Sequence, residues 1–161
     1  MKKRFFLLVL VALALLQVTL LDCLKVFYIK PDFLFISVVL AALFFDLKWA
    51  VFFGAFAGAL KDILSLYPLG LNIILFAAWT YLVAKLSRKI SIENDLLRAL
   101  LIFVVTFSNA IVTRSIFFFL GNQNTPLGIF LRVGILESFY AALVSPLLFL
   151  AFKPVFSDYG L

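Results

Sequence analysis

Long apolar runs separated by short polar stretches dominate the pattern of residues along the chain. A membrane-spanning helix needs about 20 residues that are predominantly apolar, and the runs with their flanks leave room for six such helices. The predicted spans cover residues 5–22, 32–46, 49–66, 71–86, 96–120 and 128–152 of one domain, residues 1–161. We therefore predict an all-α integral membrane protein, built as a bundle of six transmembrane helices.

Two of the six runs differ from an ordinary span. The first has the basic start and apolar stretch of a signal peptide, but no small-x-small cleavage site follows it, and Asp22 stands before Cys23. We predict that it is retained as a span, in which Gln17 contacts a partner helix rather than lipid. The second run, Phe33–Phe45, is only about 20 Å long at 1.5 Å per residue. It needs help from its flanks or a thinner bilayer, or it is partly re-entrant.

Composition supports the membrane assignment, since 66% of the residues are hydrophobic and 14% are charged. Soluble domains average about 45–50% apolar and about 25% charged residues. The net charge of +6 reflects 14 basic against 8 acidic residues. Positive charge at the ends of spans is a topology signal, so we expect no nucleic-acid partner.

The distribution of basic residues predicts that both termini are cytoplasmic. With that orientation, the loops at residues 67–72 and 121–128 lie outside and contain no charge. Excess Lys and Arg mark the cytoplasmic side of membrane proteins. The inner ends of the predicted spans then contain Lys2, Lys3, Arg4, Lys48, Lys85, Arg88, Lys89, Arg98 and Lys153.

The stretch Gly54–Asn72, GAFAGALKDILSLYPLGLN, is unusual for a span because it holds an adjacent Lys61–Asp62 pair. Charge inside a membrane is costly enough to need a reason. Gly54 and Gly58, four residues apart, allow a neighbouring backbone to approach closely. Two interpretations remain open: a tightly packed helix pair with Asp62 bound to a partner group, or a contact with a ligand or another protein.

Two further charged residues fall deep in the predicted spans, Arg114 in the fifth and Glu137 in the sixth. Charged groups at this depth usually pair across helices. Our hypothesis is that Asp62 and Glu137 accept hydrogen bonds from Lys61 or Arg114 and form a polar cluster in the outer half of the bundle. Small residues surround Glu137 on its helix face, namely Gly134, Ser138, Ala141 and Ser145.

The sequence shows no set of residues for catalysis. It has no histidine, one cysteine, and none of the G-x-S-x-G, H-E-x-x-H or P-loop motifs. We expect no enzyme activity, no metal site and no cofactor, although buried acids also serve as proton relays in transporters. The 21 phenylalanines are interpreted as bulk that faces lipid.

The ordered set of Pro31-Asp32, Gly54-xxx-Gly58-xxx-Asp62 and Pro68-Leu69-Gly70-Leu71-Asn72 resembles the bacterial rod-shape protein family MreD. The resemblance implies a non-catalytic subunit, in the bacterial cytoplasmic membrane, of the machinery that builds lateral cell-wall peptidoglycan. It also implies contact with membrane lipids and with MreC, and through MreC with the glycosyltransferase RodA, its transpeptidase partner and MreB. The fold it implies is similar to the S components of energy-coupling-factor transporters.

We expect a lateral groove between helices to receive the transmembrane segment of MreC, because the third and sixth spans have faces of small residues. The alternative function is an S-component-like subunit that binds a solute or vitamin for an energy-coupling-factor transporter, with its ligand at the outer polar cluster. Candidates for partner contact or for the polar core are Gly54, Gly58, Asp62, Pro68, Gly70, Asn72, Arg114 and Glu137.

Overall fold

A computed structural model of the chain describes residues 2–19, 32–64, 70–88, 94–120 and 127–156. These residues form six α-helices, which confirms the all-α prediction and the number of helices. The helix bounds agree with the predicted ranges to within four residues. The helices are α1 (Lys2–Thr19), α2 (Phe33–Phe44), α3 (Leu47–Leu64), α4 (Leu71–Ser87), α5 (Asp95–Phe119) and α6 (Leu127–Phe156).

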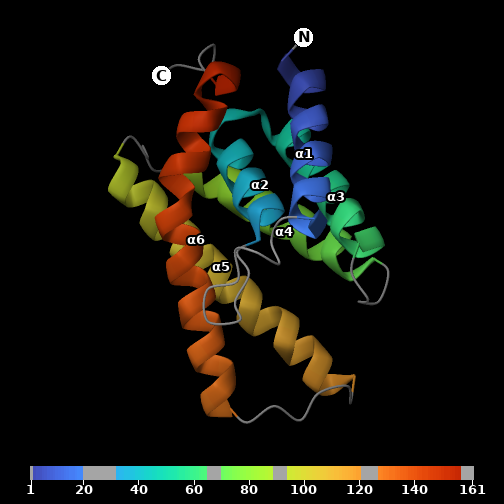
Figure 1. The fold of residues 1–161 in the computed structure, drawn as a ribbon, viewed down its shortest axis with the longest axis vertical. Helices are drawn as coiled ribbons and strands as arrows, with labels where there is room; N and C mark the ends of the chain where they lie inside the picture. The colour runs from blue at the N-terminus through green and yellow to red at the C-terminus, as the bar shows by residue number, and fades with distance from the viewer. Residues whose placement is uncertain (1, 20–31, 65–69, 89–93, 121–126, 157–161) are drawn as a thin grey trace.

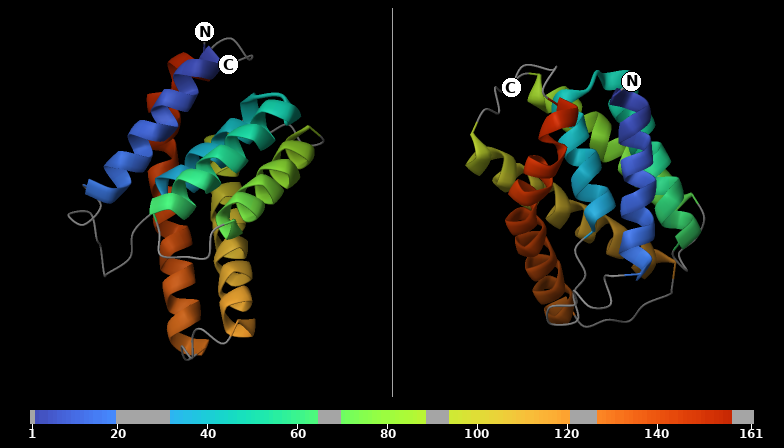
Figure 2. Two further views of the ribbon diagram at one scale, coloured as in Figure 1. Left: turned by 90° about the vertical axis from the view of Figure 1, so that its right-hand side faces the viewer. Right: turned by 45° about the horizontal axis from the view of Figure 1, so that its top comes forward.

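Successive helices run in opposite directions, so the start of α1 and the end of α6 lie at the same end of the molecule (Figure 1). Helices α1 to α4 form a compact group beside the C-terminal half of α6. At the opposite end, the last turns of α5 and the first turns of α6 extend beyond this group, as Figure 2 also shows. The molecule therefore has a packed part and a projecting helix pair.

Helix α2 is the centre of the packed part. Nine of its 12 residues are buried, and it packs against each of the other five helices. Its 12 residues rise only about 18 Å, too little for a span surrounded by lipid. The structure shows one continuous helix that other helices enclose, so its short length follows from its central position.

The interpretation of the phenylalanines as bulk that faces lipid is wrong for many of them. The ring of Phe6 on α1 is fully buried. Its centroid lies 5.3 Å from that of Phe45, 4.9 Å from that of Phe53 and 5.7 Å from that of Phe152. Edge-on and tilted contacts of this kind favour aromatic pairs beyond the area they bury. In contrast, Phe118 on α5 is 67% exposed, as predicted.

The two glycines of α3 form its contact with α4. A Cβ atom on Gly58 would lie 2.7 Å from the carbonyl carbon of Asn72 and 2.7 Å from the Cα atom of Ile73. A Cβ atom on Gly54 would lie 3.0 Å from the carbonyl oxygen of Phe76. At Gly58 the backbone of α4 leaves no room for a side chain, and at Gly54 a Cβ atom would also meet the side chain of Thr80. The glycine face of α3 is therefore used within the protein, and α4 covers it.

Helix α6 continues through Pro146 because a neighbouring hydroxyl replaces a lost hydrogen bond. Proline has no N–H group to donate to the carbonyl oxygen four residues earlier, which belongs to Ala142. The Ser145 hydroxyl donates to that oxygen over 2.8 Å. The carbonyl group is satisfied locally, and the helix continues to its end at Phe156.

Two helices of the described residues are long and apolar enough to cross a membrane, Asp95–Phe119 and Leu131–Phe152. The apolar helical segments Arg4–Gln17, Phe33–Phe44 and Leu71–Ser87 are shorter. Only 22% of the residues in the most apolar part of each long helix are buried. Helices α5 and α6 therefore present most of the exposed apolar surface.

We predict that Gly58→Ala destabilises the fold because the new methyl group meets the backbone of α4. Overpacking of this kind costs about 1–3 kcal/mol in the free energy of unfolding. Gly128→Ala is the matched control, since nothing lies within 4 Å of its Cβ position. Thermal denaturation in detergent, followed by circular dichroism, measures both variants. Equal midpoints for Gly58→Ala and Gly128→Ala would contradict the close α3–α4 contact.

Candidate functional site

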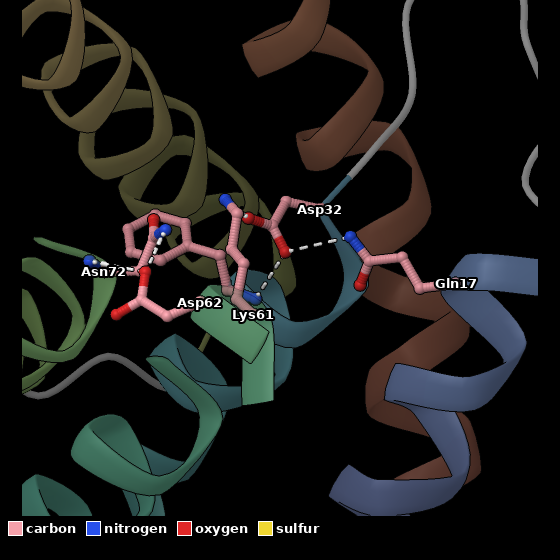
Figure 3. Close-up of polar contacts among 6 residues, drawn as sticks. Gln17, Asp32, Lys61, Asp62 and Asn72 are labelled. Carbon is pink, nitrogen blue, oxygen red and sulfur yellow. Dashed lines mark hydrogen bonds and ion pairs between the residues drawn. The ribbon is translucent and has the colours of Figure 1, made fainter. Parts of the chain in front are cut away.

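The carboxylate of Asp32 joins three helices at the start of α2. As N-cap residue, its Oδ1 atom accepts from the backbone N–H of Phe35 over 3.1 Å. The same group forms an ion pair with Lys61 on α3 and accepts from Gln17 on α1 over 3.4 Å (Figure 3). Negative charge is favourable at a helix N-terminus, where the first N–H groups have no partner inside the helix. The contact of Gln17 with a neighbouring helix is as predicted.

The carboxylate of Asp62, which is 2% exposed, binds the start of α4. It accepts from the backbone N–H groups of Gly70, Asn72 and Ile73 over 2.9, 3.2 and 3.2 Å. It also accepts from the Asn72 side-chain amide over 2.7 Å (Figure 3). Gly70 has a φ of 99°, a conformation that glycine adopts without steric cost. A side chain from α3 therefore caps α4.

These contacts differ from the pairing that the sequence suggested for Asp62. The hypothesis gave it Lys61 or Arg114 as partner, whereas its hydrogen bonds come from α4 and Lys61 pairs with Asp32. Adjacent helix residues point about 100° apart. Lys61 and Asp62 consequently reach different neighbours, Lys61 the start of α2 and Asp62 the start of α4.

A cavity of about 150 Å³ is lined by the end of α3, the start of α4, the C-terminal half of α5 and the N-terminal half of α6. The structure brings the predicted residues Arg114 and Glu137 together with Lys61 on its walls, although Asp62 faces α4 instead. The other walls are formed by Asn72, Asn109, Ala110, Thr113, Phe117 and Gly134. Lys61 therefore belongs both to the network on Asp32 and to the lining of the cavity.

The remaining candidates have structural positions. Gly54 and Gly58 pack against α4, and Gly70 and Asn72 form the capped start of α4. Pro68 lies outside the described residues. The small residues of α6 also face inward, because Ser138, Ala141 and Ser145 are buried.

Sequence reasoning missed the roles of Asp32 and Arg98. In the sequence, Asp32 stands out only through the Pro31-Asp32 motif, and its contacts with α1 and α3 had no signal there. Arg98 was counted as an inner basic residue, yet it is only 8% exposed. Its guanidinium carbon lies 4.3 Å from the ring centroid of Phe149, and it donates to Asp95 over 2.9 Å. The spacing of Asp95 and Arg98, three residues apart on one helix, was the available signal.

Comparison with known families gives a match over almost the whole chain. Residues 2–155 match the family described as rod shape-determining protein MreD. No curated protein and no solved structure matches the chain. The likeness to S components therefore stays a prediction.

We predict that Asp62→Asn weakens the fold, because the amide group has less capacity to accept from the N–H groups of α4. Unsatisfied buried donors cost about 1–3 kcal/mol in the free energy of unfolding. Asp46→Asn is the control, since Asp46 is an exposed aspartate in the turn between α2 and α3. Denaturant titration in detergent compares them. A normal stability of Asp62→Asn would contradict the capping role.

We also predict that Asp32 and Lys61 are coupled. Removing one partner of a buried ion pair leaves an uncompensated charge, whereas removing both is milder. Asp32→Asn and Lys61→Met should each lower the free energy of unfolding. The double variant should lower it by less than the sum of the two single effects, and the difference, the coupling energy, should be about 0.5–3 kcal/mol. A double-mutant cycle of unfolding free energies measures this. Strict additivity would show that the pair contributes nothing to stability.

Proposed function

Because the chain belongs to the MreD family of rod shape-determining membrane proteins, we propose that it binds the transmembrane segment of MreC. The family is part of the cell-wall elongation machinery and is non-catalytic. The match over residues 2–155 is the observation that carries the proposal. Through MreC, the protein would be linked to RodA, its transpeptidase partner and MreB, and so to lateral peptidoglycan synthesis.

In this proposal, six spans lie in the bacterial cytoplasmic membrane with both termini in the cytoplasm. The common location of the start of α1 and the end of α6 supports an even number of crossings (Figure 1). Basic residues also lie toward this end, with Lys48 at the start of α3, and Lys85 and Arg88 at the end of α4. Excess positive charge is typical of the cytoplasmic side.

We place the MreC contact on the exposed face of α5 and α6. The small-residue faces of α3 and α6, which suggested a groove, are used inside the protein. Helices α5 and α6 keep long apolar faces that are mostly unburied. Helix association in a membrane is driven by van der Waals packing, for which a helix face must be uncovered. The face includes Leu100, Val104 and Ile111 on α5 and Phe139, Leu143 and Leu147 on α6.

The test uses a photo-crosslinking amino acid at single positions of the full chain co-expressed with MreC. We expect MreC to co-purify in detergent and to crosslink from position 139 on α6. Position 74 is the matched control, because Ile74 on α4 is 71% exposed and Phe139 is 61% exposed. The crosslink from position 139 should exceed that from position 74 several-fold.

The outcomes separate the surface from the function. Co-purification with crosslinks from position 74 alone would contradict the α5–α6 surface and keep MreC as partner. If MreC does not co-purify with the chain, the proposed binding of MreC is contradicted. A vitamin retained through purification, without MreC, would support the solute-binding alternative.

A further inference from the structure

The cavity lined by α3, α4, α5 and α6 holds both signs of charge. Arg114 and Lys61 are hydrogen-bond donors on its walls, and the carboxylate of Glu137 is an acceptor. Polar and charged groups within a membrane protein are costly unless they face one another, water or a ligand. A wall with this composition accommodates polar contents.

Asn109 is a second acceptor in this cavity. Its Oδ1 atom is buried and has no hydrogen-bond partner among the residues that the structure describes. A buried acceptor without a partner costs about 1–3 kcal/mol. A donor inside the cavity would remove that cost, and Glu137, on the same walls, would accept from the same kind of group.

Among the residues that the structure describes, the charges near the cavity balance, and this balance points to a class of ligand. Lys61 and Arg114 supply two positive charges, while Glu137 and the Asp32 bound to Lys61 supply two negative charges. A purely anionic ligand would leave Glu137 opposed by like charge. A group with one negative and one positive end matches both kinds of wall. The volume of about 150 Å³ is sufficient for a small group, since an engineered protein cavity of that volume binds benzene.

We propose that this cavity binds the headgroup of a zwitterionic phospholipid that has a primary ammonium group. The phosphate lies against Arg114 and Lys61, and the ammonium donates to Glu137 and Asn109. The proposal rests on the membrane location of the family and not on the contact with MreC.

Exposed apolar residues on the helices that form the cavity favour a lipid over a soluble zwitterion. The two helices that form most of the cavity wall, α5 and α6, also carry exposed apolar side chains, among them Val112, Leu131 and Ile135 with 36%, 38% and 47% exposure. These side chains provide a surface for acyl chains on the same helices as the polar walls. A soluble headgroup has no acyl chains to contact that surface. Its binding would therefore lack the favourable free energy of contact between apolar groups.

The test measures lipid binding to the full chain in detergent by native mass spectrometry. The added lipids are phosphatidylethanolamine, phosphatidylcholine and phosphatidylglycerol with identical acyl chains. Phosphatidylethanolamine should bind about tenfold more tightly than the other two, because the loss of one hydrogen bond to a charged group has this size. Phosphatidylcholine lacks the N–H donors, and phosphatidylglycerol lacks the ammonium. Equal binding of all three lipids would overturn the proposal, whatever the variants do.

Variants locate the site. Glu137→Gln should reduce the preference for phosphatidylethanolamine over phosphatidylglycerol, and Arg114→Gln should weaken the binding of all three lipids. Arg132→Gln is the control for Arg114→Gln, because Arg132 is exposed and does not line the cavity. An unchanged preference in a folded Glu137→Gln variant would overturn the proposed site.

Free phosphoethanolamine distinguishes a lipid from a soluble source of the same headgroup. At equal concentration it should raise the thermal midpoint of the protein far less than phosphatidylethanolamine does. Equal stabilisation by the free headgroup would overturn the assignment to a lipid. The comparison of the three phospholipids and the comparison with free phosphoethanolamine both use the wild-type protein. They test the lipid proposal even where a variant does not fold.

Discussion

The first N–H groups of a helix have no partner inside that helix, and the fold depends on how α2 and α4 satisfy theirs. In a membrane, water does not satisfy such groups, so the protein must. Asp32 does this for α2 from its own N-cap position, and Asp62 does it for α4 from the end of α3. Each carboxylate also joins its helix start to other helices, since Asp32 contacts α1 and α3 and Asp62 itself lies on α3. The same bonds that complete a helix therefore fix its neighbours.

The packing of α1 to α4 follows from these fixed helix starts. With α4 held at the end of α3, the two backbones run close together, and Gly54 and Gly58 make room for the contact. Helix α2 then lies enclosed between its neighbours, and the ring of Phe6 fills the space beside it. The small-residue faces of α3 and α6 form internal contacts. In our proposal, a membrane partner therefore contacts the apolar faces of α5 and α6.

The projecting helix pair gives the protein its second feature, the polar cavity. Lys61 links the two parts, because it pairs with Asp32 in the packed part and lines the cavity with Arg114 and Glu137. Among the described residues, the positive charges of Lys61 and Arg114 are matched by the negative charges of Asp32 and Glu137. This match lowers the free-energy cost of placing charged groups within a membrane. The scaffold and the proposed lipid site therefore share Lys61 and Asn72.

Sequence alone determined the six helices and their approximate bounds, because apolar runs of this length have few other uses, and an ordered set of short motifs indicated the family. It did not determine which phenylalanines are buried, since lipid is as apolar as the protein core and hydrophobicity does not distinguish them. It marked Asp62 as important but not its partners, and it missed Asp32 and the burial of Arg98. Only the tertiary structure decided these contacts, because the direction of a side chain has meaning only once the neighbouring helix is in place.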